Sequence, residues 1–187
     1  MKKAFFLDRD GVINVEIGYL HEAEKTGLLP GVAEAVKKIH ARGYMAVVTS
    51  NQAGVAKGYY PEACVHEVHA RIQRLLLENY GSDALIDAWY YCVHHPEFTG
   101  KCSCRKPEPG MLLKAAADFN IDLSRSFMAG DRITDLQAGK NGGCAGCCLV
   151  TTGVGREHLA EAVAGGFKTA ASLPEAVDVL LDGATVQ

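Results

Sequence analysis

The sequence predicts an α/β protein: a three-layer, Rossmann-like parallel sheet with helices on both faces. Short apolar runs alternate with amphipathic segments along the 187 residues, which is the pattern of a mainly parallel sheet covered by helices. Polar residues suited to chemistry follow several of these runs directly, and ligands bind such sheets at the carboxyl ends of their strands. The length suits one domain over residues 1–187, with enough chain for a substantial core.

The apolar runs are the predicted strands. They cover residues 4–8, 45–49, 86–93, 126–129 and 147–151, with a short sixth strand at 167–170. A polar loop, residues 11–29, follows the first strand, and an irregular stretch, residues 94–106, follows the third. Both loops interrupt the alternation and are the expected places for binding residues.

Amphipathic spacing predicts the helices between these strands. They cover residues 31–43, 61–79, 107–120, 134–141 and 158–164, with a last helix from 173. The first begins after Pro30-Gly31 and has Val32, Val36 and Ile39 on its inner face. Ser172 is the predicted N-cap of the last helix, and residues 183–187 are expected to fray.

Composition and charge exclude several classes of partner. The formal net charge is −3 and 22% of residues are charged, which gives no basic surface for nucleic acid or an anionic membrane. Lys2 and Lys3 imitate the start of a signal peptide, but the apolar run behind them is short and meets Asp8. Neither nucleotide-binding glycine motif is present in the required setting. We expect a monomeric, cytoplasmic protein with no membrane contact.

Asp8 and Asp10 stand at the end of the first apolar run, two residues apart. Residues two apart in an extended strand point to the same side, so both carboxylates share a face and Arg9 points away. Repulsion between them favours a cation or a shared proton, and Gly11 lets the backbone approach a ligand. The pattern predicts a nucleophile, an acid/base group and a magnesium site, with ordinary turn aspartates as the alternative.

Three later segments bring further polar residues to the same edge of the predicted sheet. These residues are Ser50 and Asn51, Arg105 and Lys106, and Asp131. One carboxylate can act as a covalent nucleophile, and a second can protonate a leaving oxygen and later activate water. Mg²⁺ prefers carboxylate and phosphate oxygens, while a lysine and a hydroxyl can hold the other phosphoryl oxygens. The residue types therefore fit phosphoryl transfer.

Four stretches in this order resemble the motifs of the haloacid dehalogenase superfamily of phosphatases. They are Asp8-Arg9-Asp10-Gly11, Val47-Val48-Thr49-Ser50-Asn51-Gln52, Arg105-Lys106-Pro107 and Gly130-Asp131-x-x-x-Asp135. The resemblance implies that Asp8 forms an aspartyl-phosphate and that Asp10 is the general acid/base. Ser50 and Lys106 would position the phosphoryl group, with Asn51 beside it. No long insertion is present, so we expect no separate cap domain.

The same resemblance implies the metal ligands. Asp8, the backbone carbonyl of Asp10, and Asp131 would bind Mg²⁺, and Asp135 would support the site. Asp135 could instead face solvent or cap a helix. Ser50 stands where the superfamily has Thr or Ser, and could instead be only a cap or turn residue.

Two cysteine-containing stretches frame a short loop at about residues 92–104. Cys92, His94, Cys102 and Cys104 supply three thiolates and an imidazole, a full tetrahedral set for structural Zn²⁺ with no open position. Such a site would hold a polar loop that has no core of its own, and would fix Arg105 and Lys106. His95 could replace His94, which we favour because the Cys-x-His spacing matches the superfamily. Free cysteines are the alternative.

The remaining cysteines point to packing in a reducing compartment, because seven is an odd number and the chain is not small. Cys144, Cys147 and Cys148 contain a C-x-x-C spacing without a second pair, and we interpret them as core residues. Cys64 is also expected to be structural.

The zinc loop narrows the resemblance to a subfamily of heptose bisphosphate and histidinol-phosphate phosphatases. Residues 18–22, 51–58 and 106–112 resemble the heptose type, which implies a sugar phosphate substrate in heptose nucleotide synthesis. Histidinol phosphate or another small sugar phosphate is the alternative. A non-catalytic, zinc-stabilised binding module is a third hypothesis, but it would not need both Asp8 and Asp10.

A substrate with two phosphates needs a second cation. Arg105 is the best candidate, through planar bidentate pairing. Lys57 could serve instead or be a solvated surface lysine, and His21 could contact sugar or simply lie on the surface. With an open site, we expect specificity to come from residues 16–25, residues 54–60 and the zinc loop.

Overall fold

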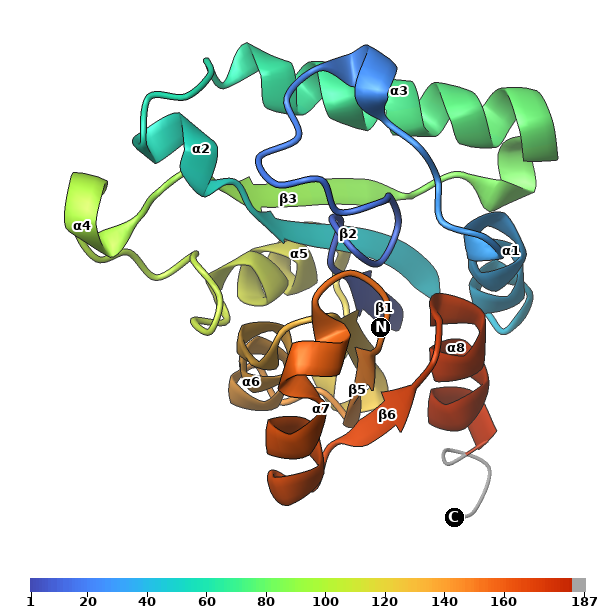
Figure 1. Cartoon of the computed structure of the whole chain (residues 1–187). Helices are drawn as coiled ribbons and strands as arrows, with labels where there is room; N and C mark the ends of the chain where they lie inside the picture. Colours follow the sequence, from blue (N-terminus) through green and yellow to red (C-terminus); the bar gives the residue numbers. More distant parts are fainter. Residues whose placement is uncertain (183–187) are drawn as a thin grey trace.

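A computed structural model describes residues 1–182, and in this part of the chain it contains one six-stranded sheet. All neighbouring strands pair in parallel, in the order β3-β2-β1-β4-β5-β6 (Figure 1). The strands are β1 (Ala4–Leu7), β2 (Met45–Asn51), β3 (Ala88–Cys92), β4 (Phe127–Gly130), β5 (Gly146–Val150) and β6 (Lys168–Ala170). The predicted α/β class and the sixth strand are confirmed.

The order of the strands reverses at β1, because the chain first builds outward through β2 and β3 and then returns to place β4 on the other side. Such a reversal opens a crevice outside the carboxyl ends of the central strands. The residues that follow β1 and β4, and those at the end of β2, therefore meet at one place. The sequence did not reveal this order, but it did identify the residues that meet there.

Helices cover both faces of the sheet, as predicted (Figure 1). The helices are α1 (Val32–Ala41), α2 (Ala53–Ala56), α3 (Ala63–Tyr80), α4 (Pro96–Thr99), α5 (Gly110–Phe119), α6 (Ile133–Asn141), α7 (Gly155–Ala164) and α8 (Leu173–Asp182). Residues of α1, α3 and α8 pack into one core, and residues of α5, α6 and α7 pack into a second. The sheet lies between these two cores, which gives three layers.

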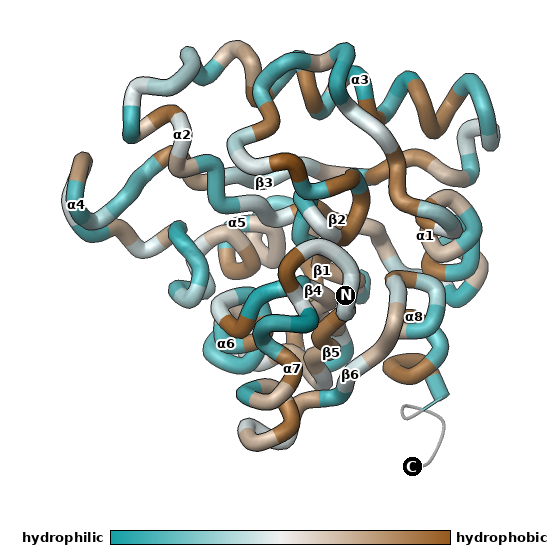
Figure 2. Tube along the Cα trace, in the orientation of Figure 1, coloured by the Kyte–Doolittle hydropathy of each residue, from teal (hydrophilic) through white to brown (hydrophobic). Residues whose placement is uncertain are grey.

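Strand β1 shows why the sheet is buried on both sides. Phe5 and Leu7 belong to one core, while Ala4 and Phe6 belong to the other, and none of the four is exposed. Side chains alternate across a strand, so a strand covered on both faces must be apolar at every position. The helices need only one apolar side, and in Figure 2 hydrophobic and hydrophilic residues alternate along α3.

Several predicted boundaries were wrong by a few residues. The four-residue helices α2 and α4 lie inside stretches that we predicted as loops, and α7 begins at Gly155 rather than at 158. Helices this short contain about one turn, so they show no amphipathic period. Ser172 precedes α8, where we predicted an N-cap. The side-chain hydrogen bond at the N-terminus of α8 is instead made by Glu175, whose carboxylate accepts from the Ala171 amide at 2.8 Å.

Two further observations complete the fold. Within residues 1–182, none of the helices has both the length and the apolar character needed to span a bilayer. The predicted frayed segment, residues 183–187, lies outside the described residues.

Candidate active site

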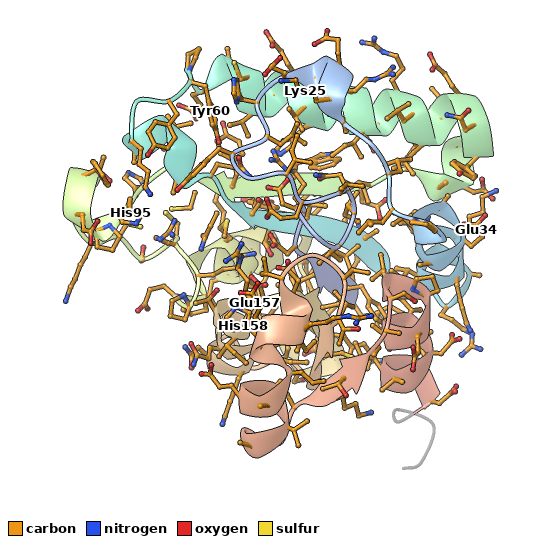
Figure 3. All side chains as sticks on the ribbon, viewed as in Figure 1. Lys25, Glu34, Tyr60, His95, Glu157 and His158 are labelled. Carbon is orange, nitrogen blue, oxygen red and sulfur yellow. The ribbon has the colours of Figure 1, made fainter. Side chains whose placement is uncertain are left out.

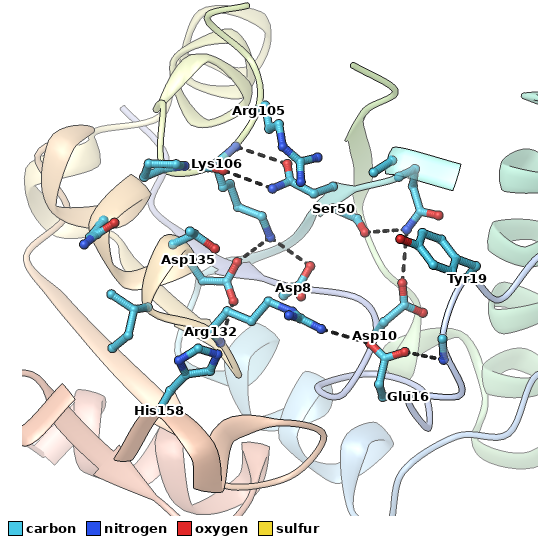
Figure 4. Close-up of a pocket in the computed structure, with 18 of the residues that line it drawn as sticks. Asp8, Asp10, Glu16, Tyr19, Ser50, Arg105, Lys106, Arg132, Asp135 and His158 are labelled. Carbon is cyan, nitrogen blue, oxygen red and sulfur yellow. Dashed lines mark hydrogen bonds and ion pairs between the residues drawn. The ribbon is translucent and has the colours of Figure 1, made fainter. Parts of the chain in front are cut away.

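A cavity of about 690 Å³ opens at the carboxyl edge of the sheet. It brings together six of the predicted site residues: Asp8, Asp10, Ser50, Asn51, Arg105 and Lys106. Figure 4 shows Asp8 between two groups of side chains, with Lys106 and Asp135 on one side and Ser50 and Asp10 on the other. The four sequence motifs therefore converge on one cavity.

Lys106 is the buried cation of the site. Its Nζ donates to Asp8 Oδ1 at 2.8 Å and to the carbonyl oxygen of Thr49 at 2.6 Å, and forms an ion pair with Asp135 Oδ1 at 2.7 Å. Burial by itself lowers the pKa of this ammonium, but the two carboxylates outweigh it, and the net shift of the pKa is upward. Lys106 is therefore held as a fixed positive charge beside Asp8.

Three buried carboxylates cluster in this part of the site, and two of them, Asp8 and Asp135, contact Lys106. One oxygen each from Asp8, Asp131 and Asp135 lies within 4.8 Å of the others. Burial, reinforced by neighbouring carboxylates, raises the pKa of Asp8 to about 7 and the pKa of Asp131 to about 8. Negative charge therefore exceeds positive charge here, and an added cation would favour the ionised forms.

The donor set fits Mg²⁺. Asp131 is fully buried, and its Oδ1 has no hydrogen-bond partner in residues 1–182. Its nearest cationic atom among the described residues is Arg132 Nε, at 3.9 Å. A buried carboxylate oxygen without a hydrogen bond is costly, and coordination by a hard cation removes that cost. The Asp10 carbonyl oxygen accepts no backbone hydrogen bond in the described part of the chain, so it also remains available as a ligand.

Two glycines allow the backbone to pass close to Asp131. A Cβ added at Gly11 or at Gly153 would lie 2.2 Å from Asp131 Oδ2, and both residues have positive φ angles, 81° and 56°. The second carboxylate oxygen of Asp131 accepts from the Val154 amide at 3.0 Å. The carboxylate is thus fixed in a slot that side chains larger than glycine would fill.

Asp135 does not face solvent. It is completely buried, and its Oδ2 accepts from the Arg132 amide at 2.9 Å, at the start of α6. Its Oδ1 pairs with Lys106. The side chain therefore caps the helix and also balances the lysine, which combines two of the interpretations that the sequence left open.

The prediction that Arg9 points away from Asp10 was wrong. Arg9 is fully buried, and its Nη2 lies 2.8 Å from Asp10 Oδ2, while its Nε lies 3.1 Å from Oδ1. The Asn14 side chain also donates to Asp10 Oδ1, at 2.9 Å. Strand β1 ends at Leu7, so the alternation rule no longer applies when the chain turns at Gly11.

Ser50, rather than Thr49, faces the cavity. Ser50 lines it, whereas Thr49 is buried and is not among the lining residues. The neighbouring Asn51 clamps the backbone of Lys106, because its Nδ2 donates to the Lys106 carbonyl and its Oδ1 accepts from the Lys106 amide, both at 3.1 Å. Asn51 therefore joins the end of β2 to the segment that carries the lysine.

The predicted zinc ligands form a second cluster. Cys92, His94, Cys102 and Cys104 each place one ligand atom within 4.8 Å of the others. The Cys104 sulfur lies 3.4 Å from His94 Nδ1 and 3.3 Å from the Cys102 sulfur, spacings that suit four ligands around one Zn²⁺. His95 lies outside the cluster and caps α4 instead, where its Nδ1 accepts from the Glu97 amide.

The other cysteines match the packing interpretation. All seven cysteines are free. Cys147 and Cys148 are buried in the two cores, and Cys144 packs against one of them. The Cys144–Cys148 segment therefore has a place in the core, and Cys64 is partly buried on α3.

Of the three residues predicted as possible substrate contacts, one lines the cavity and two do not. Arg105 lines the cavity, and its Nη1 donates to the carbonyl of His94 at 3.2 Å. Lys57 does not line the cavity; its Nζ donates to the Tyr19 hydroxyl at 2.7 Å. His21 also lies outside the lining and stacks on Tyr60, with ring centroids 4.9 Å apart.

The cavity also contains residues that the sequence did not single out. Glu16, Tyr19 and Tyr60 lie in the two segments predicted to carry specificity, residues 16–25 and 54–60, whereas Arg132 and His158 were missed. Figure 3 shows Tyr60 near α2 and His158 on α7, so the cavity wall comes from distant segments. Arg132 lies 3.6 Å from Glu16 as an ion pair. Its position directly after Asp131 was the only sequence signal for it.

Comparison with known proteins places this geometry in a family. A family model described as HAD-hydrolase-like matches residues 103–176. A D-glycero-D-manno-heptose-1,7-bisphosphate 7-phosphatase of Thermosynechococcus vestitus is 45% identical over 84% of this chain and 83% of its own. The chain belongs to the haloacid dehalogenase-like hydrolases. A second member of the family, the D-glycero-beta-D-manno-heptose-1,7-bisphosphate 7-phosphatase of Escherichia coli K12, is 38% identical over 93% of each chain.

Solved structures of heptose bisphosphate phosphatases resemble this chain over nearly its whole length. The D,D-heptose 1,7-bisphosphate phosphatase of B. bronchiseptica was crystallised with magnesium and phosphate. It superposes with a TM-score of 0.84 at 32% identity, covering 97% of this chain and 99% of its own. The enzyme from Burkholderia thailandensis superposes with a TM-score of 0.67 at 29% identity, over 96% and 99% of the two chains.

Proposed function

We propose that the protein is a magnesium-dependent phosphatase that removes the 7-phosphate of D-glycero-D-manno-heptose 1,7-bisphosphate. One observation carries the chemistry: Asp8, Asp10, Ser50 and Lys106 converge on a single cavity beside carboxylates that need a cation. The substrate follows from the relatives, which bear this activity in their names and match almost the whole chain. The proposed setting is the synthesis of ADP- or GDP-heptose.

In the first step, a carboxylate oxygen of Asp8 attacks the phosphorus atom. The ester bond between phosphorus and the sugar oxygen breaks, and a proton from Asp10 passes to that oxygen as it leaves. The product on the protein is an aspartyl-phosphate. Lys106 remains beside Asp8 throughout, at 2.8 Å in this structure, and stabilises the charge on the phosphoryl oxygens.

In the second step, water attacks the phosphorus atom of the aspartyl-phosphate. Asp10, now ionised, takes a proton from that water, and the bond between phosphorus and Asp8 breaks. Inorganic phosphate leaves, and both aspartates return to their starting states. Ser50 is the proposed hydrogen-bond donor to the phosphoryl group in both steps, with Asn51 next to it.

Asp8, the Asp10 carbonyl and Asp131 are the proposed Mg²⁺ ligands. When bound there, Mg²⁺ would neutralise charge on the phosphate and on the crowded carboxylates. Cys92, His94, Cys102 and Cys104 are the proposed ligands of a structural Zn²⁺. Arg105 follows the last of these cysteines directly, lines the cavity and is the proposed partner of the second phosphate.

Three broader properties are part of the same proposal. We infer one phosphatase domain over residues 1–187, with the zinc loop at about residues 92–104. We infer a monomer that acts on a small sugar phosphate and has no nucleic-acid or membrane partner. We place it in the cytoplasm, a reducing compartment in which free cysteines persist.

A kinetic comparison tests the proposed substrate. The full-length chain with Mg²⁺ is given heptose 1,7-bisphosphate and, separately, histidinol phosphate. We expect a higher kcat/KM for the bisphosphate and release of one phosphate per molecule. A higher kcat/KM for histidinol phosphate would overturn the substrate, while the phosphatase chemistry would stand.

The nucleophile is tested with the Asp8→Asn variant. This change keeps the size of the side chain and removes the nucleophilic carboxylate, so turnover of every phosphate ester should fall to background. The Asp178→Asn variant is a matched control, because Asp178 lies on α8 in an ion pair with Lys38, away from the cavity. Substantial turnover by Asp8→Asn would exclude Asp8 as the nucleophile.

A further inference from the structure

Three buried side chains at the edge of the cavity have no role in the proposed reaction. Gln52, Arg9 and Tyr60 are all buried, and they bond to one another and to the two groups that the reaction uses, Asp10 and Ser50. Figure 4 shows Asp10 and Ser50 on the same side of the cavity, together with Tyr19. The centre of this arrangement is Gln52.

The amide of Gln52 is fully engaged. Its Nε2 donates to Ser50 Oγ at 2.8 Å and to Asp10 Oδ2 at 3.1 Å. Its Oε1 accepts from Arg9 Nη2 at 3.3 Å and from the Tyr60 hydroxyl at 3.1 Å. A primary amide offers two N–H donors and two acceptor sites on its oxygen, so every position is used.

Chemistry permits only one orientation of this amide. A guanidinium is always protonated and can only donate, and burial raises the pKa of Tyr60 to about 12, so its phenol keeps its proton. A flipped amide would turn its NH₂ group toward the Arg9 guanidinium and its oxygen toward the Asp10 carboxylate. Arg9 and Tyr60 therefore fix which end of Gln52 faces Ser50.

This orientation determines where the Ser50 proton goes. The Ser50 oxygen accepts from Gln52, and a hydroxyl has only one proton of its own to donate. Within residues 1–182 that proton meets no hydrogen-bond acceptor, and Ser50 lines the cavity. The hydroxyl is thus left to donate to a ligand in the cavity, which suits the acceptor oxygens of a phosphoryl group.

We propose that Gln52 is a positioning residue that acts through Ser50 and Asp10. Held by Arg9 and Tyr60, its amide directs the Ser50 O–H at the phosphoryl group and holds the Asp10 carboxylate on the leaving-group side. The inference rests on the proposed function, because it assumes the roles of Ser50 and Asp10. Gln52 itself neither touches substrate nor transfers a proton.

Two variants of nearly equal size test this role. Gln52→Met removes all polar atoms of the amide. Gln52→Glu keeps the acceptor oxygen that Arg9 and Tyr60 use, but a second oxygen replaces the NH₂ group, so the ionised side chain donates to neither Ser50 nor Asp10. We expect kcat for p-nitrophenyl phosphate with Mg²⁺ to fall about tenfold or more in both variants. We also expect Gln52→Glu to be no more active than Gln52→Met.

A purely structural role of Gln52 predicts the opposite order of activities, with Gln52→Glu more active than Gln52→Met. If Gln52 only satisfies Arg9 and Tyr60, then Gln52→Glu retains activity close to that of the unmodified chain, and this result would overturn the inference. The matched control is Gln73→Glu on α3, because among residues 1–182 the Gln73 amide bonds only to the backbone of Ile86, at 2.9 and 3.0 Å. Circular dichroism and the Mg²⁺ affinity from calorimetry identify any variant that is misfolded.

A double-mutant cycle shows whether Gln52 acts through Ser50. In the Ser50→Ala background, the loss of kcat caused by Gln52→Met should shrink severalfold, because part of the interaction is already gone. If the losses of kcat in the two single variants are fully additive in the double variant, Gln52 does not act through Ser50. If the unmodified chain with Mg²⁺ hydrolyses no phosphate ester, the proposed function fails and the inference fails with it; an active chain with unaffected Gln52 variants overturns the inference alone.

Discussion

At the scale of single residues, the site depends on how tightly the backbone approaches two carboxylates, Asp131 and Asp135. Gly11 and Gly153 leave room for Asp131, and Gly130 does the same for Asp135, where an added Cβ would lie 2.2 Å from the Asp135 Cβ. These glycines are not interchangeable with alanine, because each one faces a carboxylate that has no space to move. The positions of the carboxylates in the proposed metal site therefore depend on the absence of side chains at these glycines.

Gly153→Ala should weaken Mg²⁺ binding. The new Cβ would lie 2.2 Å from Asp131 Oδ2 and 2.7 Å from the Gly11 Cα, so the carboxylate must shift from its position. We expect the Mg²⁺ concentration for half-maximal activity to rise about tenfold or more, as when the support of a metal ligand is lost. A titration of activity with Mg²⁺ measures this directly.

The matched control is Gly143→Ala. Gly143 also has a positive φ, 83°, but a Cβ there meets no atom of the described residues within 4 Å. This variant carries a similar backbone strain of about 1 kcal/mol without displacing a ligand. Equal Mg²⁺ requirements in the two variants would show that Asp131 is not the affected group.

At the scale of elements, the cysteine loop connects β3 to the start of α5 and carries Arg105 and Lys106. The Cys92 cluster lies at its base, and the Arg105 side chain bonds to the His94 carbonyl. Asn51 clamps the backbone of Lys106 from the other side. Lys106 is thus held from two sides, and in the proposed ligand assignment one of these anchors would depend on bound Zn²⁺.

Loss of the metal anchor should lower activity as well as stability. In Cys104→Ser, one of four ligands is lost two residues before Lys106, so we expect less bound zinc and a kcat reduced by about tenfold or more. Metal analysis and phosphatase kinetics on the same sample measure both effects. Cys64→Ser is the control, since Cys64 lies on α3 outside the cluster.

A chain with Cys104→Ser that keeps its full zinc content would rule out the assigned ligand set. Loss of zinc with an unchanged kcat would show instead that the Asn51 clamp alone suffices to position Lys106. The two results are distinguishable because metal content and turnover are measured independently.

At the scale of the whole molecule, the sequence predicted the fold class, every strand and the convergence of the motif residues. Those predictions rest on period and composition, which local sequence carries well. It did not predict the burial of Arg9 or its contact with Asp10, and it left the role of Asp135 open between supporting the site, facing solvent and capping a helix, because these roles depend on partners that only the folded chain supplies. The same reason explains why Arg132 and His158, which come from two different segments, were missed as parts of the cavity wall.

One buried group ties overall stability to pH. His69 on α3 is buried and stacks on Trp89, with centroids 4.4 Å apart, and its Nε2 has no partner among residues 1–182. Burial, together with the charge of Arg9, lowers the pKa of His69 to about 3, although Asp10 acts in the opposite direction. In the folded protein the ring therefore stays neutral at mildly acidic pH.

We expect this histidine to make the protein less stable as pH falls below the pKa of a free imidazole, about 6.5. Between that value and the folded pKa of about 3, the unfolded chain binds a proton that the folded chain does not, so acid favours unfolding. The free energy of unfolding should fall by up to ~1.4 kcal/mol per pH unit through this group alone.

His69→Phe keeps a ring against Trp89 and removes the titration. Urea unfolding at pH 7, 6, 5 and 4 should show the two curves of stability against pH diverging, with the variant gaining relative to the unmodified chain at each step toward acid. Other titrating groups are common to both chains, so parallel curves would mean that His69 is protonated in the folded state as well.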